Sequence, residues 1–184
     1  MKFVISGRPG VGKSTLFNLI VEALKKRGYV VGGFIAPEVR EGGIRQGFKL
    51  VDLLTGEETW LARRGYPSNT RVGSYGVLVE TADKLASKAL LRALEVADVI
   101  AIDEVGPMEL KLPSFKQNLL RALDSGKPML LVVHHRLEDS EIMSRLGDAV
   151  KIFVSVENRE ELRNKIPGEV VAALERFRRV LESW

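Results

Sequence analysis

The sequence predicts an α/β fold in which a mainly parallel β-sheet is covered by helices on both faces. Short apolar runs alternate along the chain with segments of helical periodicity, and a glycine-rich turn joins the first run to the first helix. Several of these runs, Met129 to Val133 among them, are apolar along their whole length, as strands buried on both faces are. Such strands alternating with helices are typical of parallel sheets. We expect a single domain over residues 1–184, with an antiparallel β meander inserted after the first helix.

The composition excludes several classes of protein. Hydrophobic residues make up 45% and charged residues 28% of the chain, as in an ordinary globular protein, so neither disorder nor a fibrous repeat is indicated. The absence of cysteine excludes disulfides, thiolate metal sites and cysteine nucleophiles, and together with the scarcity of glutamine it favours a thermophile. The apolar run at the N-terminus is too short for a signal peptide or a membrane span, so we expect a cytoplasmic protein. The net charge of +4 is scattered, which leaves nucleic-acid binding open without indicating it.

The first half of the chain is predicted to hold a strand, a helix and the meander. Lys2 to Ser6 is the strand. The helix starts near Lys13 and ends at Gly28, because apolar residues recur between them at helical spacing: Leu16, Leu19, Ile20, Ala23 and Leu24. From Tyr29 to about Gly76, short β-rich runs are broken at Gly42-Gly43 and at Thr55-Gly56. Both breaks are typical of hairpin turns and predict the antiparallel meander.

The second half returns to strands and helices in alternation. One helix is predicted from Thr81 to Val96, and another begins near Ser114, which forms a capping-box pattern with Gln117. Three further apolar strands are predicted: Val99 to Ile102, Met129 to Val133 and Ala149 to Val156. Two helices are expected to close the chain, Asn158 to Ile166 and Pro167 to Trp184.

A phosphate-binding loop lies between the first strand and the first helix. Gly7, Gly12, Lys13 and Ser14 satisfy the pattern G-x-x-x-x-G-K-[ST]. The glycines let successive backbone N–H groups turn inward around an anion, and the following helix adds the positive end of its dipole. Lys13 supplies a charge for the β- and γ-phosphates, and the Ser14 hydroxyl is a ligand for Mg²⁺. Because chance gives this pattern in about one chain in a hundred or fewer, the loop predicts nucleotide binding.

Two carboxylates, Asp103 and Glu104, directly follow the strand predicted to end at Ile102. Ligands of parallel α/β sheets bind beyond the carboxyl ends of the strands, so both side chains are expected to face the phosphate loop. We expect Asp103 to hold Mg²⁺, directly or through water, while the metal bridges the β- and γ-phosphates. Glu104 is expected to orient and deprotonate an attacking water. The plainer alternative is that the pair only opens a solvated loop.

His134, Arg136 and Arg8 are candidates for contacts with the γ-phosphate or the transition state. His134 follows the strand Met129 to Val133 and is a candidate sensor, with a surface histidine as the equally weighted alternative. Arg136 and Arg8 are candidates for stabilising transition-state charge, although an exposed arginine is usually only solvated.

Other charged residues remain ambiguous from the sequence. Arg159 lies where nucleotide-binding folds often hold the base, whereas Asn158 and Glu161 beside it form a capping-box pattern. No role for Glu109 emerges. The arginines of the meander suit an acceptor or an RNA, or else the polar face of a hairpin: Arg40, Arg45, Arg63 and Arg64.

The sequence resembles the small P-loop nucleoside-triphosphatases found in thermophiles, which are similar to the human cancer-related nucleoside-triphosphatase. The resemblance covers Met1 to about Pro167 and rests on five segments: "GRPGVGKSTL", "GFIAPEVREGGIRQGFKLVDL", "IDEVGPMEL", "HHR" and "SVENREEL". It implies a RecA-like variant of the P-loop fold, with Mg²⁺-dependent hydrolysis of ATP, GTP, CTP and UTP and little base selectivity.

The resemblance also implies the site. It assigns nucleotide binding to Gly7 to Ser14 and to the segment around Ile102 to Gly106, with Glu104 as the catalytic acid. From the residue types themselves, Lys13 joins Glu104 as an expected catalytic residue, and Ser14 and Asp103 are the expected metal ligands. The residues expected to bind nucleotide are Gly7, Arg8, Pro9, Gly10, Val11, Gly12, Lys13, Ser14, Thr15, Ile102, Asp103, Glu104, Val105 and Gly106.

Hydrolysis is the leading prediction among three functions. The first alternative is a nucleotide or small-molecule kinase, in which the meander holds an acceptor and Glu104 deprotonates its hydroxyl. The second is an NTP-dependent switch or RNA-binding module with slow hydrolysis. No segment marks an oligomer interface, so the oligomeric state stays unknown.

Overall fold

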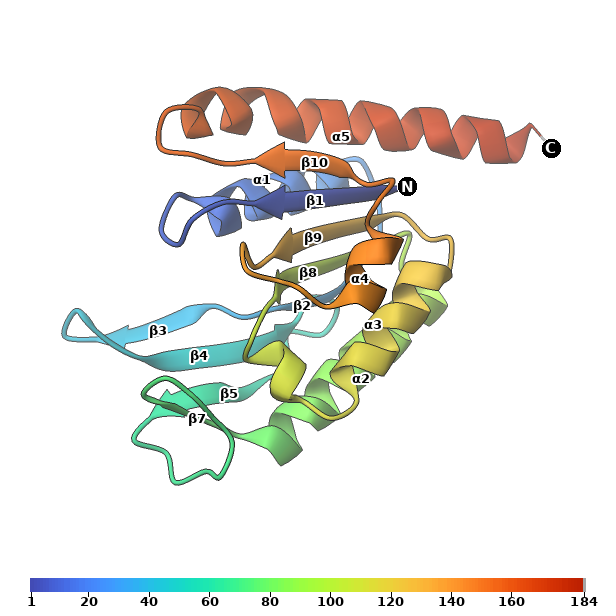
Figure 1. Cartoon of the computed structure of the whole chain (residues 1–184). Helices are drawn as coiled ribbons and strands as arrows, with labels where there is room; N and C mark the ends of the chain where they lie inside the picture. Colours follow the sequence, from blue (N-terminus) through green and yellow to red (C-terminus); the bar gives the residue numbers. More distant parts are fainter. Residues whose placement is uncertain (184) are drawn as a thin grey trace.

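The computed structural model describes residues 1–183 as one ten-stranded sheet with helices on both faces (Figure 1). The strands are β1 Lys2–Ser6, β2 Val31–Ile35, β3 Glu38–Glu41, β4 Ile44–Asp52, β5 Glu58–Arg64, β6 Arg71–Val72, β7 Tyr75–Val77, β8 Val99–Val105, β9 Met129–Val133 and β10 Val150–Phe153. The helices are α1 Lys13–Lys26, α2 Val79–Val96, the 3₁₀ turn η1 Glu109–Lys111, α3 Phe115–Asp124, α4 Ser140–Arg145 and α5 Arg159–Glu182.

The sheet has a parallel half and an antiparallel half. Its strand order is β10-β1-β9-β8-β2-β4-β5-β7-β6, and β3 pairs with β4. All pairs from β10 to β2 are parallel and all others are antiparallel. The α/β fold with a meander after the first helix is confirmed. β2 belongs to both halves, because it pairs parallel to β8 along its length and antiparallel to β4 at Phe34 and Ile35. The prediction of a purely antiparallel meander from Tyr29 onward is therefore wrong for β2.

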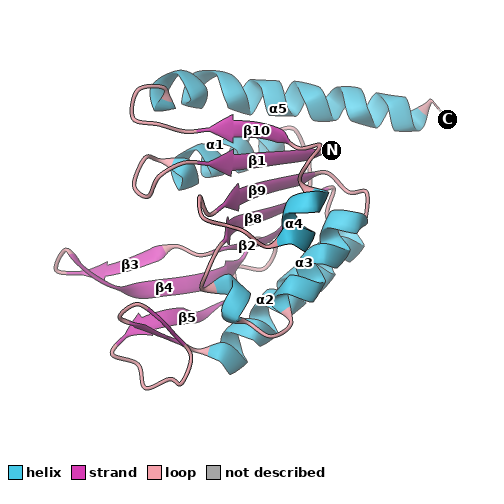
Figure 2. Ribbon diagram, viewed as in Figure 1, coloured by secondary structure: helices cyan, strands magenta, loops and turns pink. Residues whose placement is uncertain are grey.

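The hairpin turns of the meander lie where they were predicted. Gly42 and Gly43 join β3 to β4, and Thr55 and Gly56 lie between β4 and β5. Figure 2 shows the β3–β4 hairpin extending beyond the parallel strands, on the side where the arrowheads of those strands point. The meander therefore stands beside the edge at which the parallel strands end.

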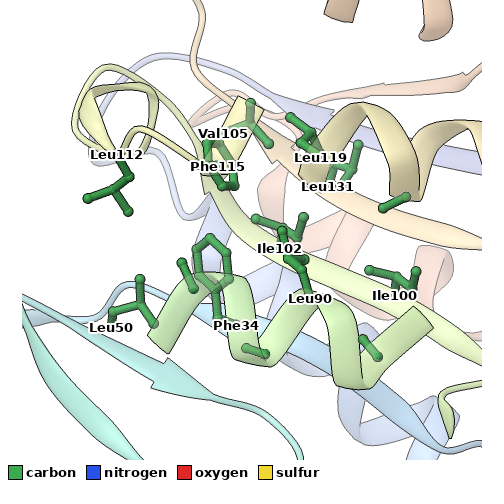
Figure 3. Packing of buried hydrophobic residues seen from close by; sticks show 14 of the residues in the cluster. Phe34, Leu50, Leu90, Ile100, Ile102, Val105, Leu112, Phe115, Leu119 and Leu131 are labelled. Atoms are coloured by element: carbon green, nitrogen blue, oxygen red, sulfur yellow. The ribbon is translucent and has the colours of Figure 1, made fainter. Parts of the chain in front are cut away.

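Successive residues of the parallel strands pack into different cores. On β1, Phe3 and Ile5 pack with α1 and α5, whereas Val4 belongs to the core under α2 and α3. The same alternation on β8 places Ile100 and Ile102 in that second core. Figure 3 shows this core, where Phe34 and Phe115 meet edge to face with ring centroids 5.7 Å apart. Burial on both faces explains why these strands are apolar throughout.

One long helix closes the described chain where two were expected. α5 runs through Pro167 without a break, so the predicted division there is wrong. Leu162, Ile166, Val170 and Leu174 recur every four residues across the proline and pack into the core shared with α1. This continuous contact outweighs the hydrogen bond that a proline removes from a helix. Trp184, which was included in the second predicted helix, lies outside the described residues.

The two predicted capping boxes are both wrong, because each side chain binds elsewhere. The Ser114 amide and hydroxyl donate to the Asp83 carboxylate, at 3.0 and 2.8 Å, and tie the start of α3 to α2. Asn158 donates from Nδ2 to the Phe153 carbonyl at 2.9 Å and accepts from the Ser155 amide at 2.8 Å. This turn ends β10 at Phe153, so the prediction of a strand as far as Val156 is also wrong.

Two smaller features were not predicted from the sequence. The short helix α4 is capped by Asp139, whose side chain accepts from the amides of Glu141 and Ile142. Helix α2 begins at Val79, two residues before the predicted start. Within residues 1–183, none of the helices combines the length and apolar character needed to cross a membrane.

Candidate active site

The phosphate loop leaves the parallel half of the sheet between β1 and α1. β1 pairs with β9 on one side and β10 on the other, so the loop opens at the carboxyl edge of the sheet. Lys13 is the first residue of α1, and its Nζ donates to the carbonyls of Gly7 and Arg8 at 3.0 and 2.9 Å. No acidic residue occupies the first turn of α1, so no negative side chain there competes with a bound phosphate for the positive end of the helix dipole.

A β-bulge brings Asp103 and Glu104 to the same side of the sheet. β8 continues to Val105, so the prediction of a strand ending at Ile102 is wrong. Asp103 pairs with Val132 and Val105 pairs with Val133, which leaves Glu104 as an extra residue on β8. Adjacent side chains of a regular strand point to opposite faces, whereas a bulge re-aims one of them. Both carboxylates consequently line one cavity, together with Ser14.

Burial raises the pKa values of both carboxylates. Asp103 is 9% exposed, and burial raises its pKa, while a hydrogen bond with the Ser14 hydroxyl and the charge of Lys13 oppose that rise. The pKa of Glu104 is raised to about 7 by burial and by the Asp103 charge, again against Lys13. Near neutral pH, a Glu104 with this pKa exchanges a proton readily, as a general base must.

The donor set beside the loop suits a hard divalent cation such as Mg²⁺. The Ser14 hydroxyl lies near enough to the Asp103 carboxylate to lower its pKa, and both residues line the same cavity, so two oxygen ligands lie together. No three His, Cys, Asp or Glu side chains among residues 1–183 are grouped to hold a metal by themselves. Mg²⁺ does not need such a cage, because it is usually bound by one or two protein oxygens, phosphates and waters.

The cavity beside Glu104 has a volume of about 520 Å³. Its near wall is formed by Ser14 and the two carboxylates. The connection from β2 to β3, the meander and the start of η1 also line the cavity, through Ala36, Pro37, Glu38, Phe48, Val72, Met108 and Glu109. A water molecule takes up about 30 Å³ in the liquid, so the cavity has room for much more than the attacking water.

Glu109 joins this cavity although the sequence suggested no role for it. It is 5% exposed, and burial raises its pKa to about 8 against hydrogen bonds from the backbone of Glu109 and Gly106. A Cβ added to Gly106 would lie 2.7 Å from Glu104 Oε1 and 3.2 Å from Glu109 Oε2. The only signal in the sequence was its distance of five residues from Glu104, which does not identify a buried partner.

His134 reaches the cavity, whereas Arg136 and Arg8 do not. The His134 amide donates to the Val105 carbonyl at 3.0 Å, and its Nδ1 accepts from the Arg136 amide at 3.2 Å. Burial lowers the pKa of His134, and the charges of His135 and Lys13 lower it further, which favours a neutral imidazole. Arg136 is exposed and outside the cavity lining, and Arg8 lines a different groove.

Three arginines of the meander contact other side chains of the meander. Arg40 and Arg45 both form ion pairs with Glu38. The Arg63 guanidinium lies over the Trp60 ring, 5.1 Å from its centroid. Arg64 is exposed at the end of β5. These contacts favour the polar face of a hairpin over an acceptor or RNA site.

Comparisons with known proteins find relatives over nearly the whole chain. A family model described as NTPase matches residues 2–167. The curated nucleoside-triphosphatase THEP1 of Hyperthermus butylicus is 48% identical over 181 residues, covering 97% of this chain and 96% of the relative. That of Thermofilum pendens is 44% identical over 178 residues, covering 95% and 97%.

Two solved structures share the fold. THEP1 from the hyperthermophile Aquifex aeolicus superposes with a TM-score of 0.80 at 33% identity, over 95% of this chain and 99% of its own. The solution structure of a human cancer-related nucleoside triphosphatase gives a TM-score of 0.76 at 32% identity, over 92% and 96%.

Proposed function

The chain belongs to the NTPase family and is a nucleoside-triphosphatase, and we propose that it hydrolyses ATP, GTP, CTP and UTP with Mg²⁺ and with little base selectivity. The products are the nucleoside diphosphate and phosphate. Under this proposal the enzyme works in the cytoplasm, where these substrates and Mg²⁺ are found.

The position of Glu104 carries the proposal. Its carboxylate shares a cavity with Ser14 and Asp103, on the side of the loop where the γ-phosphate would lie. Glu104 takes a proton from water as the water oxygen bonds to the γ-phosphorus, and the bond from that phosphorus to the β–γ bridging oxygen breaks. Lys13 offsets the charge that develops on the phosphate oxygens. Mg²⁺ held by Ser14 and Asp103 would add positive charge at the β- and γ-phosphates.

The opposite side of the phosphate loop supports low base selectivity. A groove there is lined by Arg8, Val11, Val154, Ser155, Glu157 and two exposed apolar residues, Phe153 and Val156. These two side chains are 63% and 59% exposed. Apolar surface of this kind accepts the face of any base, whereas base identity is read through hydrogen bonds to the base edge.

Phosphate release tests the proposal directly. We expect release from ATP, GTP, CTP and UTP at rates within an order of magnitude of one another, only with Mg²⁺, and lost in Lys13→Ala. Release without Mg²⁺, or undiminished in Lys13→Ala, would contradict the mechanism. Phosphate release from only one of the four nucleotides would contradict the low base selectivity.

A second candidate function is phosphoryl transfer to an alcohol, which the size of the cavity favours. Its volume of about 520 Å³ lies within the range of about 300–1,000 Å³ that is usual for small-molecule sites. The acceptor hydroxyl would replace water, give its proton to Glu104 and take the γ-phosphoryl group. Four carboxylates line the cavity, from Glu38, Asp103, Glu104 and Glu109, and its described lining contains no lysine or arginine.

Burial favours a neutral Glu109, and Glu38 is paired with Arg40 and Arg45. The negative charge that remains is that of Asp103 and Glu104, and it disfavours a phosphorylated acceptor relative to a neutral or cationic one. Uridine and uridine 5′-monophosphate are a matched pair of probes, since they differ in charge at the reacting end. Phosphorylated product from neutral or cationic alcohols, detected by mass spectrometry, would support the transferase. A panel that leaves ATP turnover unchanged and yields no product would leave hydrolysis as the function.

A further inference from the structure

The first turns of α5 lie against the phosphate loop. β10 pairs parallel to β1, and the Val154 amide donates to the Ser6 carbonyl at 2.8 Å, so the connection from β10 to α5 runs beside the loop. Figure 1 shows both connections at the same edge of the sheet. A Cβ added to Gly12 would lie 2.8 Å from Nη2 of Arg163 and 3.9 Å from Cδ of Arg159. Because these arginines are four residues apart, one helix face presents both to the loop.

Only some of the hydrogen-bond donors of the Arg163 guanidinium have partners among its neighbours. Its Nη1 donates to Glu160 Oε1 at 2.6 Å, and the Arg163 side chain is 24% exposed. Its Nε is buried, and within residues 1–183 it has no hydrogen-bond partner. A buried donor of a charged group that lacks a partner is costly, so an oxygen ligand near Arg163 would bind favourably.

The order of the strands places Arg163 and the two carboxylates, Asp103 and Glu104, on opposite sides of the phosphate loop. β1 lies between β10 and β9, and β9 lies beside β8. The phosphate loop after β1 therefore has Asp103 and Glu104 on its β9 side and Arg163 on its β10 side. A phosphate chain whose γ end faces Glu104 has its other end directed towards α5.

We propose that Arg163 binds the phosphate chain of the nucleotide at the end remote from Glu104. A planar guanidinium matches the geometry of phosphate oxygens and remains charged at any working pH. Glu160 holds Arg163 beside the loop and competes with the phosphate for it. This inference rests on the proposed function, since it assumes that the loop binds a nucleoside triphosphate.

Equilibrium binding separates this role from catalysis. Calorimetric titration with Mg²⁺ and either ADP or inorganic triphosphate reports binding without turnover. Arg163→Gln is expected to weaken both ligands about tenfold or more, Arg163→Lys by less, and Glu160→Gln is expected to tighten both. Arg178→Gln is the matched control, since Arg178 lies on the same helix and forms its own ion pair with Glu182 at 3.0 Å.

Each outcome of these titrations decides the assignment. Wild-type affinity in Arg163→Gln would overturn it, and so would an equal loss in Arg178→Gln, which would indicate net charge alone. Weaker ADP binding with unchanged triphosphate binding would place Arg163 on the ribose or base and would also overturn it. Loss of binding in Lys13→Ala with full binding in Arg163→Gln would leave the proposed function intact and reject only the role of Arg163.

Discussion

The carboxyl groups of Glu104 and Glu109 face the same small space above Gly106. Glu104 Oε1 and Glu109 Oε2 would lie 2.7 and 3.2 Å from a Cβ added there, and both groups have raised pKa values. Two carboxylates this close cannot both be charged without strong repulsion. If Glu109 is the neutral group, Glu104 can carry the negative charge, as its proposed role as a base requires.

The replacement Glu109→Gln should reduce the dependence of stability on pH. Glu109 has a pKa of about 8 in the folded protein against an ordinary value of 4.5, so the folded state binds this proton more tightly. Its stabilising contribution is complete below about pH 4.5 and is lost as the pH rises through about 8. Urea unfolding between pH 5 and 9 should show a smaller decline in Glu109→Gln than in the wild type. The exposed control Glu161→Gln should decline as the wild type does. Glu104 still contributes a decline in Glu109→Gln, so only a decline as large as that of the wild type would refute the explanation.

The replacement Glu104→Gln should separate binding from hydrolysis. The amide cannot accept the proton of water, so turnover should fall by about 10²–10⁴-fold. Lys13, Ser14 and Asp103 remain in place, so calorimetric affinity for ADP with Mg²⁺ should stay near the wild-type value. Undiminished phosphate release would show that another group is the base.

The replacement Asp52→Ala should destabilise the attachment of the meander. Asp52 is fully buried and accepts from the Leu54 and Thr55 amides and, at 2.8 Å, from Arg92 of α2. Removing the Asp52 carboxylate leaves the Leu54 and Thr55 amides without an acceptor, while the partly exposed Arg92 can turn to water, and the expected loss is about 1–3 kcal/mol in urea unfolding. The nearby control Glu57→Gln breaks only the exposed pair with Lys88 and should change stability little. Equal effects of the two changes would mean that Asp52 has no special role.

Two glycines should respond in opposite directions to alanine. Gly33 of β2 has a φ of +117°, and an added Cβ would lie 2.0 Å from the Ala101 carbonyl oxygen of β8. Gly33→Ala is therefore expected to cost about 2–5 kcal/mol. Gly168 of α5 has open space around its Cα, so Gly168→Ala should stabilise by about 0.5–1 kcal/mol. Thermal unfolding of both variants measures the contrast.

The sequence predicted those parts of the fold that depend on local pattern. The apolar strands, the hairpin turns at Gly42-Gly43 and Thr55-Gly56 and the turn between the first strand and the first helix are all local signals. Each was found in the right part of the chain, although the predicted ends of β8 and β10 were wrong. The break at Pro167 was wrong because packing of α5 on α1 is a tertiary effect. Ser114 and Asn158 are residue types that favour helix N-caps, but the Ser114 side chain binds Asp83 and the Asn158 side chain binds the Phe153 carbonyl instead.

The site was harder to predict, because its geometry depends on contacts between distant segments. The bulge at Glu104 is defined by the pairing of β8 with β9, and the residues of β8 alone do not predict it. Arg163 approaches Gly12 only because β10 lies beside β1. Part of the cavity lining comes from the meander, about 30 residues or more before the carboxylates in the chain. The spacing of residues along the sequence predicts none of these contacts.

The bulge in β8 also bears on how such a site could change during evolution. Deleting Glu104 would restore an uninterrupted ladder between β8 and β9 and would leave Asp103 beside Ser14. With the roles proposed above, the product would keep the metal ligands and the phosphate loop but would lose the base. Under that proposal, a single codon would separate an enzyme that hydrolyses nucleotides from a protein that only binds them.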